Sequence, residues 1–239
     1  MCAGLDYVVG MQLPFGGIAW SQEPGGTVNR DALLAGSSSI YHSLRAGLAL
    51  ADLVGDPQPG WELAAGRLRH TLEAHRDLFL DKSSFSMDWY YPVLGGPLRG
   101  RAALELLAGR WDDFVEPGLG ARCVDANPWV TGAETCELVM ALDNISDRER
   151  SLRLFADMQH TRHGGGLYWT GYVFTDEVFW PHEQTTYTSA AVVLACDALS
   201  RTTPASGVFR GERMPAQPAP IALDCGCPDA ARSSEAARR

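Results

Sequence analysis

The chain has 239 residues, of which 46% are hydrophobic and 21% charged, which is enough apolar content for one soluble globular core. Its net charge of -9 argues against a nucleic-acid partner, and its six cysteines show neither paired C-x-x-C spacing nor the density of a disulfide scaffold. No apolar run approaches the roughly 18 residues of a membrane span, and Asp6, Pro14 and Gly16 interrupt the stretch where a signal peptide would be apolar. We therefore expect a cytoplasmic protein without a structural metal.

Apolar residues recur at helical spacing through most of the chain, and alternating runs of strand length are scarce. The predicted helices cover, in chain order, residues 3–11, 37–53, 61–75, a short segment at 86–92, 98–114, 131–142, 147–158 and 184–199. Proline and glycine end several of them, as at Pro57 and Pro92. The pattern predicts an all-α protein.

The periodicity stops near Thr203. Beyond it, proline, alanine, serine and arginine dominate, so the segment buries too little apolar surface to offset the entropy of ordering it. We predict one domain over residues 1–210, with about four helical hairpins, and a disordered tail over 211–239.

Two helix ends share a pattern of glutamine, glycine and tryptophan. One runs from Gln12 to Trp20 and the other from Gln159 to Trp169, each with glycines between. Glutamine can bond the free carbonyls at a helix end, glycine accepts positive φ, and tryptophan can fill the gap between hairpins. Helix-loop-helix units that repeat at roughly 40 to 50 residues are typical of a stacked array or toroid of α-hairpins.

This pattern resembles the QW motif of terpenoid cyclases and protein prenyltransferases, which form an α/α toroid of six hairpins around a central cavity. A closer resemblance is to the actinobacterial prenyltransferase-like proteins, and it covers nearly all of residues 3–210. The segments that carry it are TGAETCEL (131–138), WTGY (169–172), AAVVLA (190–195), GSSSIYH (36–42) and SMDWYYP (86–92). Members of that family begin with further hairpins, so the resemblance implies that this chain is N-terminally truncated and forms an incomplete barrel.

Metal-binding motifs of these families are mostly missing. The sequence has neither the Asp-x-Cys of zinc-dependent prenyltransferases nor the Asp-x-Asp-Asp of class II cyclases. The string from Asp112 to Glu116 resembles the DDxxD/E element that holds Mg-diphosphate, and its two ends would share one helix face. A solvated helix end explains the same string, because acids near a helix C-terminus oppose its dipole. We expect no cofactor and no metal ligand, and keep Mg2+ only as an alternative tied to this string.

In toroids of this kind, loops between inner and outer helices line the cavity, so the resemblance directs attention to acids and aromatic rings at such loops. The candidate catalytic carboxyls are Asp88, Glu134, Glu137 and Glu183. The candidate substrate-binding residues are Trp89, Tyr90, Tyr91, Trp129, Trp169, Tyr172, Trp180 and His42. Aromatic faces stabilise a cation, and a desolvated carboxyl has a raised pKa that suits it to donate a proton. Asp88, flanked by aromatic residues, is the first choice for such a carboxyl.

Three functions remain open from the residues. The resemblance implies a transferase or cyclase that acts on an isoprenoid through a cationic intermediate. A glycoside hydrolase is the alternative, because it pairs two carboxyls around an oxocarbenium-like centre, and residues 129–142 are also similar to six-hairpin glycosidases. A binding module without chemistry is the third. The expected partner is a small molecule, either isoprenoid or saccharide.

Each candidate residue also has a structural interpretation. Tryptophan and tyrosine in hairpin repeats commonly belong to the core, and His42 suits a hydrogen-bonded core position. Of Glu134 and Glu137, one turn apart, one can face the N-terminus of a neighbouring helix, and Glu183 stands just before a predicted helix, where a carboxylate complements the helix dipole.

Overall fold

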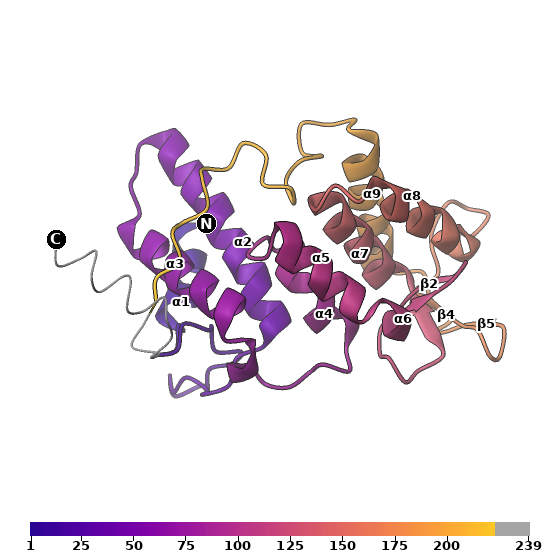
Figure 1. Ribbon diagram of the computed structural model, residues 1–239, viewed down its shortest axis with the longest axis horizontal. Coiled ribbons are helices and arrows are strands. Elements are labelled where there is room, and N and C mark those ends of the chain that lie inside the picture. Colours follow the sequence, from indigo (N-terminus) through magenta and orange to yellow (C-terminus); the bar gives the residue numbers. More distant parts are fainter. Residues whose placement is uncertain (223–239) are drawn as a thin grey trace. The chain divides into compact units, whose positions relative to one another are not determined.

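The computed structural model describes residues 1–222, and these divide into two compact units, one of residues 1–82 with 213–222 and one of Ser83–Glu212 (Figure 1). Each unit has its own hydrophobic core. The predicted tail lies outside the described residues from position 223 onward. Within residues 1–222, every helix is too short or too polar to cross a membrane.

The first unit is built on a helical hairpin. Its helices are α1 (Cys2–Gly10), α2 (Leu34–Val54), α3 (Pro59–Ala74) and the short 3-10 helix η1 (Arg76–Leu78). α2 ends at Gly55, whose φ of +71° a residue with a side chain rarely adopts, and α3 begins with a proline at its first position. Tyr41 and Leu44 of α2 and Leu68 and Leu72 of α3 are fully buried. The four-residue connection therefore joins two apolar faces that form this core.

A C-terminal stretch of the first unit lies along α2 and α3. Arg45 donates to the carbonyl of Pro215 (3.1 Å), and Arg69 donates to that of Pro218 (2.9 Å). The backbone N–H of Ile221 donates to the carbonyl of Gly66 (3.0 Å). Residues 215–221, part of the segment predicted to be disordered, thus have defined partners.

The turn after α1 has the predicted glycine conformation, but its glutamine bonds other carbonyls than those at the end of α1. Gln12 Nε2 donates to the carbonyls of Gly16 and Ala64, both at 2.9 Å. Gly16 has φ +102°, as the pattern predicts. Trp20, however, does not fill a gap between hairpins, because its side chain is 57% exposed.

Gly16 gives a prediction on stability. A Cβ at this position would lie 2.9 Å from the carbonyl oxygen of Arg67, and positive φ adds strain, so Gly16→Ala is expected to lower the free energy of unfolding by about 2 to 3 kcal/mol. Gly26 also has positive φ (+87°), but a Cβ there meets nothing within 4 Å. Gly26→Ala is the matched control and should cost about 1 kcal/mol. Urea unfolding measures both, and equal losses would contradict the close approach at Gly16.

The second unit surrounds one buried helix. Its helices are α4 (Ser86–Leu94), α5 (Gly100–Gly109), α6 (Trp111–Phe114), α7 (Gly132–Asn144), α8 (Arg148–Asp157), the 3-10 helix η2 (Met158–Thr161) and α9 (Thr186–Ser200). α7 packs against α4, α8 and α9. From Gly132 to Asp143 every residue of α7 is buried except Glu134. Side chains on α7 can therefore meet residues from three neighbouring helices.

A small antiparallel sheet completes this unit, in the order β1-β2-β3-β4-β5. The strands are β1 (Val115–Glu116), β2 (Gly120–Arg122), β3 (Trp129–Thr131), β4 (Gly171–Val173) and β5 (Val178–Phe179). The prediction of an all-α protein is therefore wrong, because the fold mixes helices with a sheet, and residues 1–222 do not show a toroid. Strands of two or three residues are too short for the alternation that marks a strand in sequence.

The predicted helix 98–114 is also interrupted. It divides into α5 and α6, and α6 ends at Phe114, so Asp112 and Glu116 do not share a helix face. Glu116 lies in β1 and pairs with Arg122 (2.5 Å). No group of three potential metal-ligating side chains occurs within residues 1–222. The shared helix face on which the diphosphate-binding interpretation of this string rests is therefore not formed.

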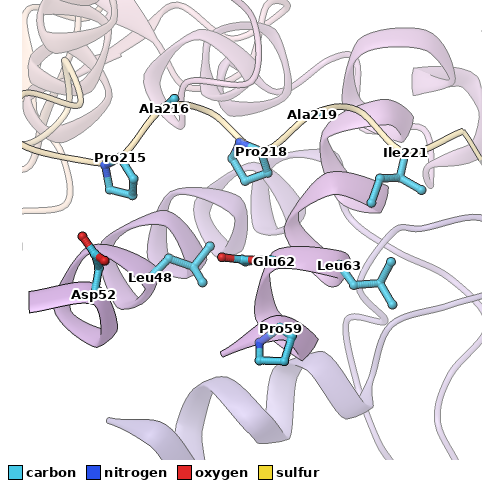
Figure 2. A pocket seen from close by; sticks show the side chains of 10 residues that line it. All are labelled: Leu48, Asp52, Pro59, Glu62, Leu63, Pro215, Ala216, Pro218, Ala219 and Ile221. Atoms are coloured by element: carbon cyan, nitrogen blue, oxygen red, sulfur yellow. The ribbon is translucent and has the colours of Figure 1, made fainter. Parts of the chain in front are cut away.

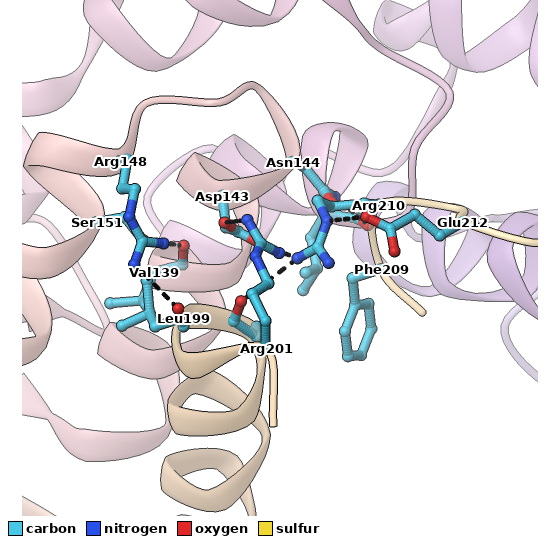
Figure 3. A network of polar contacts seen from close by, with 12 residues as sticks. Val139, Asp143, Asn144, Arg148, Ser151, Leu199, Arg201, Phe209, Arg210 and Glu212 are labelled. Carbon is cyan, nitrogen blue, oxygen red and sulfur yellow. Dashed lines mark hydrogen bonds and ion pairs between the residues drawn. The ribbon is translucent and has the colours of Figure 1, made fainter. Parts of the chain in front are cut away.

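The buried carboxylate of Asp143 binds arginines of the segment that follows α9 (Figure 3). Asp143, at the end of α7, is 3% exposed. Arg201 donates to both of its oxygens, at 2.8 and 3.0 Å, and Arg210 donates to Oδ2 as well. Arg148 adds a bond to the carbonyl of Leu199 (3.1 Å). Residues 201–210 are thereby tied to the helix at the centre of the unit.

Candidate functional site

Glu137 on α7 is a buried carboxyl held by three tyrosines. The hydroxyl of Tyr90 donates to Oε2 at 2.5 Å. The hydroxyls of Tyr91 and Tyr187 each donate to Oε1 at 2.9 Å. Because Tyr90 and Tyr91 come from α4 and Tyr187 from α9, three helices converge on one carboxyl. We call Glu137, Glu134 and the three tyrosines the Glu137 cluster.

Local structure explains how the tyrosines reach Glu137. Tyr90 and Tyr91 occupy the middle of α4, which packs directly against α7. Tyr187 stands in the first turn of α9, which begins where the Thr185 side chain accepts a bond from the Thr188 N–H. Tyr90 is fully buried, whereas the Tyr187 side chain is 59% exposed. Oε1 of Glu137 therefore lies on the side of the cluster that leads to solvent.

Burial governs the protonation of Glu137. Loss of hydration raises the pKa of this carboxyl, and the nearby charge of Glu134 raises it further. The three tyrosine hydroxyls act in the opposite direction, because they stabilise the carboxylate, but they do not cancel the effect of burial. Burial and Glu137 also raise the pKa of each tyrosine, so all three remain neutral donors. Glu137 is thus a carboxyl suited to carry and release a proton.

Glu134 is the second carboxyl of the cluster and the more accessible one. It lies one helical turn before Glu137, a spacing that places Cβ atoms about 5 to 6 Å apart. Burial, followed by the charge of the nearby Glu134, raises the pKa of the Cys123 thiol to about 12. Cys123 is therefore a neutral neighbour rather than a nucleophile.

Aromatic rings cluster on the sheet beside the start of α7. Trp129 donates from Nε1 to the carbonyl of Trp180 (2.8 Å), and the two rings meet edge to face at 5.2 Å. Trp169 stacks on Phe179 at 5.4 Å, and Tyr172 contacts the same Phe179 ring at 5.4 Å. The four candidate aromatic residues of this region thus lie on one group of neighbouring strands and loops.

The remaining predicted site residues have other surroundings. Trp89 is 3% exposed, stacks on Phe114 and belongs to the core. Asp88 lies in the first turn of α4 and is half-buried. Glu183 is exposed, and its backbone carbonyl accepts from Thr170. His42 lies on α2, in the first unit.

Two members of the site were not predicted. Tyr187 bonds Glu137, and Cys123 is near enough to Glu134 to feel its charge, yet neither was a candidate. Tyr187 lies in the first turn of the predicted helix 184–199, directly after the aromatic segment, which is the one signal in the sequence that points to it. Cys123 has no such signal, because Glu134 is eleven residues away and on another element.

The first unit has a groove of about 510 Å3 between its helices and the stretch 215–221 (Figure 2). Its lining consists of Leu48, Asp52, Pro59, Glu62, Leu63, Pro215, Ala216, Pro218, Ala219 and Ile221. Both acids are exposed, and none of the lining residues is aromatic. The combination of a buried carboxyl with aromatic rings is found in the second unit, which is the better candidate site.

The sequence was compared with known proteins. No protein-family model matches it. It is 56% identical over 223 residues to the MMP endo-(1,4)-3-O-methyl-alpha-D-mannosidase of Mycolicibacterium hassiacum. The match covers 93% of this chain and 62% of that protein, so the chain spans less than two thirds of its relative.

This likeness corrects the sequence interpretation. The prenyltransferase-like resemblance is wrong, and with it the transferase, terpenoid cyclase and isoprenoid interpretations, because a protein this similar is a glycosidase. The glycoside hydrolase alternative agrees with the relative's name. The chain is similar to a glycosidase over nearly its whole length, with no support for an isoprenoid substrate.

Proposed function

We propose that the second unit carries acid chemistry of a glycoside hydrolase that cleaves a saccharide of (1,4)-linked, 3-O-methylated α-mannose. The observation that supports this best is Glu137, a buried carboxyl with a raised pKa, one helical turn from the more accessible Glu134. The relative named for this substrate supplies the saccharide class. Because the chain spans 62% of that relative, its activity as an isolated chain is part of the proposal.

The chemistry requires a proton donor and a negative charge near the anomeric carbon. Glu137 gives its proton to the glycosidic oxygen as the bond between that oxygen and the anomeric carbon breaks. Glu134 carries the charge that stabilises the oxocarbenium-like centre. Water then bonds to the anomeric carbon, its hydroxyl replaces the leaving sugar, and the proton that it loses restores the protonated Glu137. Tyr91 and Tyr187 hold Oε1 of Glu137 in one orientation.

The pH dependence of hydrolysis tests the proton donor. Activity should fall as pH rises through the pKa of Glu137, because the donor must start protonated. Tyr187→Phe removes a hydrogen bond to the carboxylate of Glu137, so the pKa of Glu137 rises. The alkaline limb of the pH–activity profile should therefore move up by about one pH unit. The assay follows the release of reducing ends from a (1,4)-linked 3-O-methyl-α-mannose oligosaccharide by the full chain.

Tyr168→Phe is the matched control. The hydroxyl of Tyr168 donates to Gln159 rather than to Glu137. The alkaline limb of the pH–activity profile should therefore be the same in Tyr168→Phe as in the unmodified chain. Absence of cleavage by the unmodified chain would contradict the proposed activity. An alkaline limb that moves to lower pH in Tyr187→Phe would contradict the role of Glu137 as proton donor.

A further inference from the structure

The Trp129 and Trp180 pair is a rigid, accessible aromatic surface. We propose that this pair forms a platform that binds an O-methylated pyranose ring beside the Glu137 cluster, an inference that rests on the proposed function for its saccharide class. Trp180 is 56% exposed, while Trp129 is partly covered. The platform would select the methylated sugar over its unmethylated form.

The pair is fixed before any ligand arrives. The hydrogen bond from Trp129 Nε1 to the Trp180 carbonyl joins the two residues, and their rings are inclined at 73°. Trp129 also lies against the bare backbone of Gly171, where a Cβ would stand 2.3 Å from Nε1. A ring held in this way loses little conformational entropy on binding, which favours affinity.

Strand register connects the platform to the Glu137 cluster. Trp129 and Thr131 share one face of β3, and Thr131 lies opposite Ala121 of β2. The N–H of Ala121 donates to Oγ1 of Thr135 on α7 (2.8 Å), the residue that follows Glu134. β3 also leads directly into α7, so Trp129 stands five residues before Glu134 in the chain.

The chemistry of an O-methylated sugar fits this surface. A pyranose ring presents C–H groups on its faces, and a methyl ether replaces a hydroxyl donor with apolar surface that gains free energy when an indole covers it. An unmethylated hydroxyl pressed on the same surface would lose water without a partner. His182 and Glu183 are exposed directly after Trp180 and Pro181, and they offer polar groups to the remaining hydroxyls.

Calorimetric binding to the full chain tests the platform without requiring catalysis. The probes are a (1,4)-linked 3-O-methyl-α-mannose oligosaccharide and the same oligosaccharide without methyl groups. The unmodified chain should prefer the methylated probe, and Trp180→Ala should weaken its binding by about tenfold and remove the preference. Trp180→Phe keeps a ring and should retain most of the preference. Trp20→Ala is the matched control, because Trp20 is 57% exposed and lies in the first unit.

Several outcomes would overturn the platform. They are no binding by the unmodified chain, equal binding of both probes, or a loss in Trp20→Ala as large as in Trp180→Ala. Binding that depends on Trp180 without hydrolysis would leave the platform standing and remove the proposed activity. If the chain hydrolyses the oligosaccharide with the expected pH–activity profile but Trp180→Ala binds it unchanged, the platform is contradicted and the proposed activity is not.

Discussion

Glu137→Gln is expected to lower kcat/KM for the methylated mannose oligosaccharide by about a thousandfold. Glutamine has nearly the same shape and keeps an oxygen for the hydroxyls of Tyr91 and Tyr187, but it has no proton to give to the glycosidic oxygen. Initial rates measured across the pH range give the loss. The alkaline limb assigned to Glu137 should disappear from the residual activity.

The leaving group provides a sharper readout of this proton transfer. An aryl α-mannoside with an acidic phenol departs without protonation, so Glu137→Gln should lose far less activity on it than on the oligosaccharide. Glu105→Gln is the control, since Glu105 is exposed on α5 and pairs with Arg101 on the same helix. Circular dichroism and thermal unfolding verify that each variant is folded. Equal losses on both substrates would contradict proton donation by Glu137.

Helices of this protein were predictable because their apolar faces repeat over several turns. The spacing predicts helices at 131–142 and 147–158, and the structure has α7 at Gly132–Asn144 and α8 at Arg148–Asp157. The five strands were not predicted, because two or three residues carry too little alternation to be seen. Pairing between strands as distant as β3 and β4 depends on the tertiary fold rather than on the local sequence.

The mistaken family resemblance has a local cause. Gln159 donates to the carbonyl of Phe155 in the last turn of α8, Gln12 donates to the carbonyl of Gly16 in the turn after α1, and Gly16 and Gly166 both take positive φ. These contacts are what any tight exit from a helix requires, so they recur in proteins with unrelated chemistry. A turn pattern of this kind identifies the end of a helix and carries no information on the substrate.

Part of the candidate site could be predicted from sequence and part could not. Glu134 and Glu137 stand one turn apart on a helix, and the aromatic pair Tyr90 and Tyr91 marks a neighbour of that helix. The preference for Asp88 over Glu137 failed to anticipate burial, since the structure buries Glu137 and leaves Asp88 half-buried. Which carboxyl is desolvated depends on the packing of α4, α7 and α9, and no local pattern shows it.

Removal of the Asp143 carboxylate should destabilise the chain more than any other substitution considered above. Asp143→Ala leaves Arg201 and Arg210 without the buried partner that they share, which is expected to lower the free energy of unfolding by about 3 to 5 kcal/mol. Glu149→Ala is the control, because Glu149 and Arg153 form an exposed pair on α8 that should contribute less than about 0.5 kcal/mol. Urea unfolding measures both losses. In a double-mutant cycle with Arg210→Ala, the two losses should be strongly non-additive, since either substitution breaks the same buried contact. Additive losses would show that Arg210 binds Asp143 too weakly to hold the segment beyond α9 against α7.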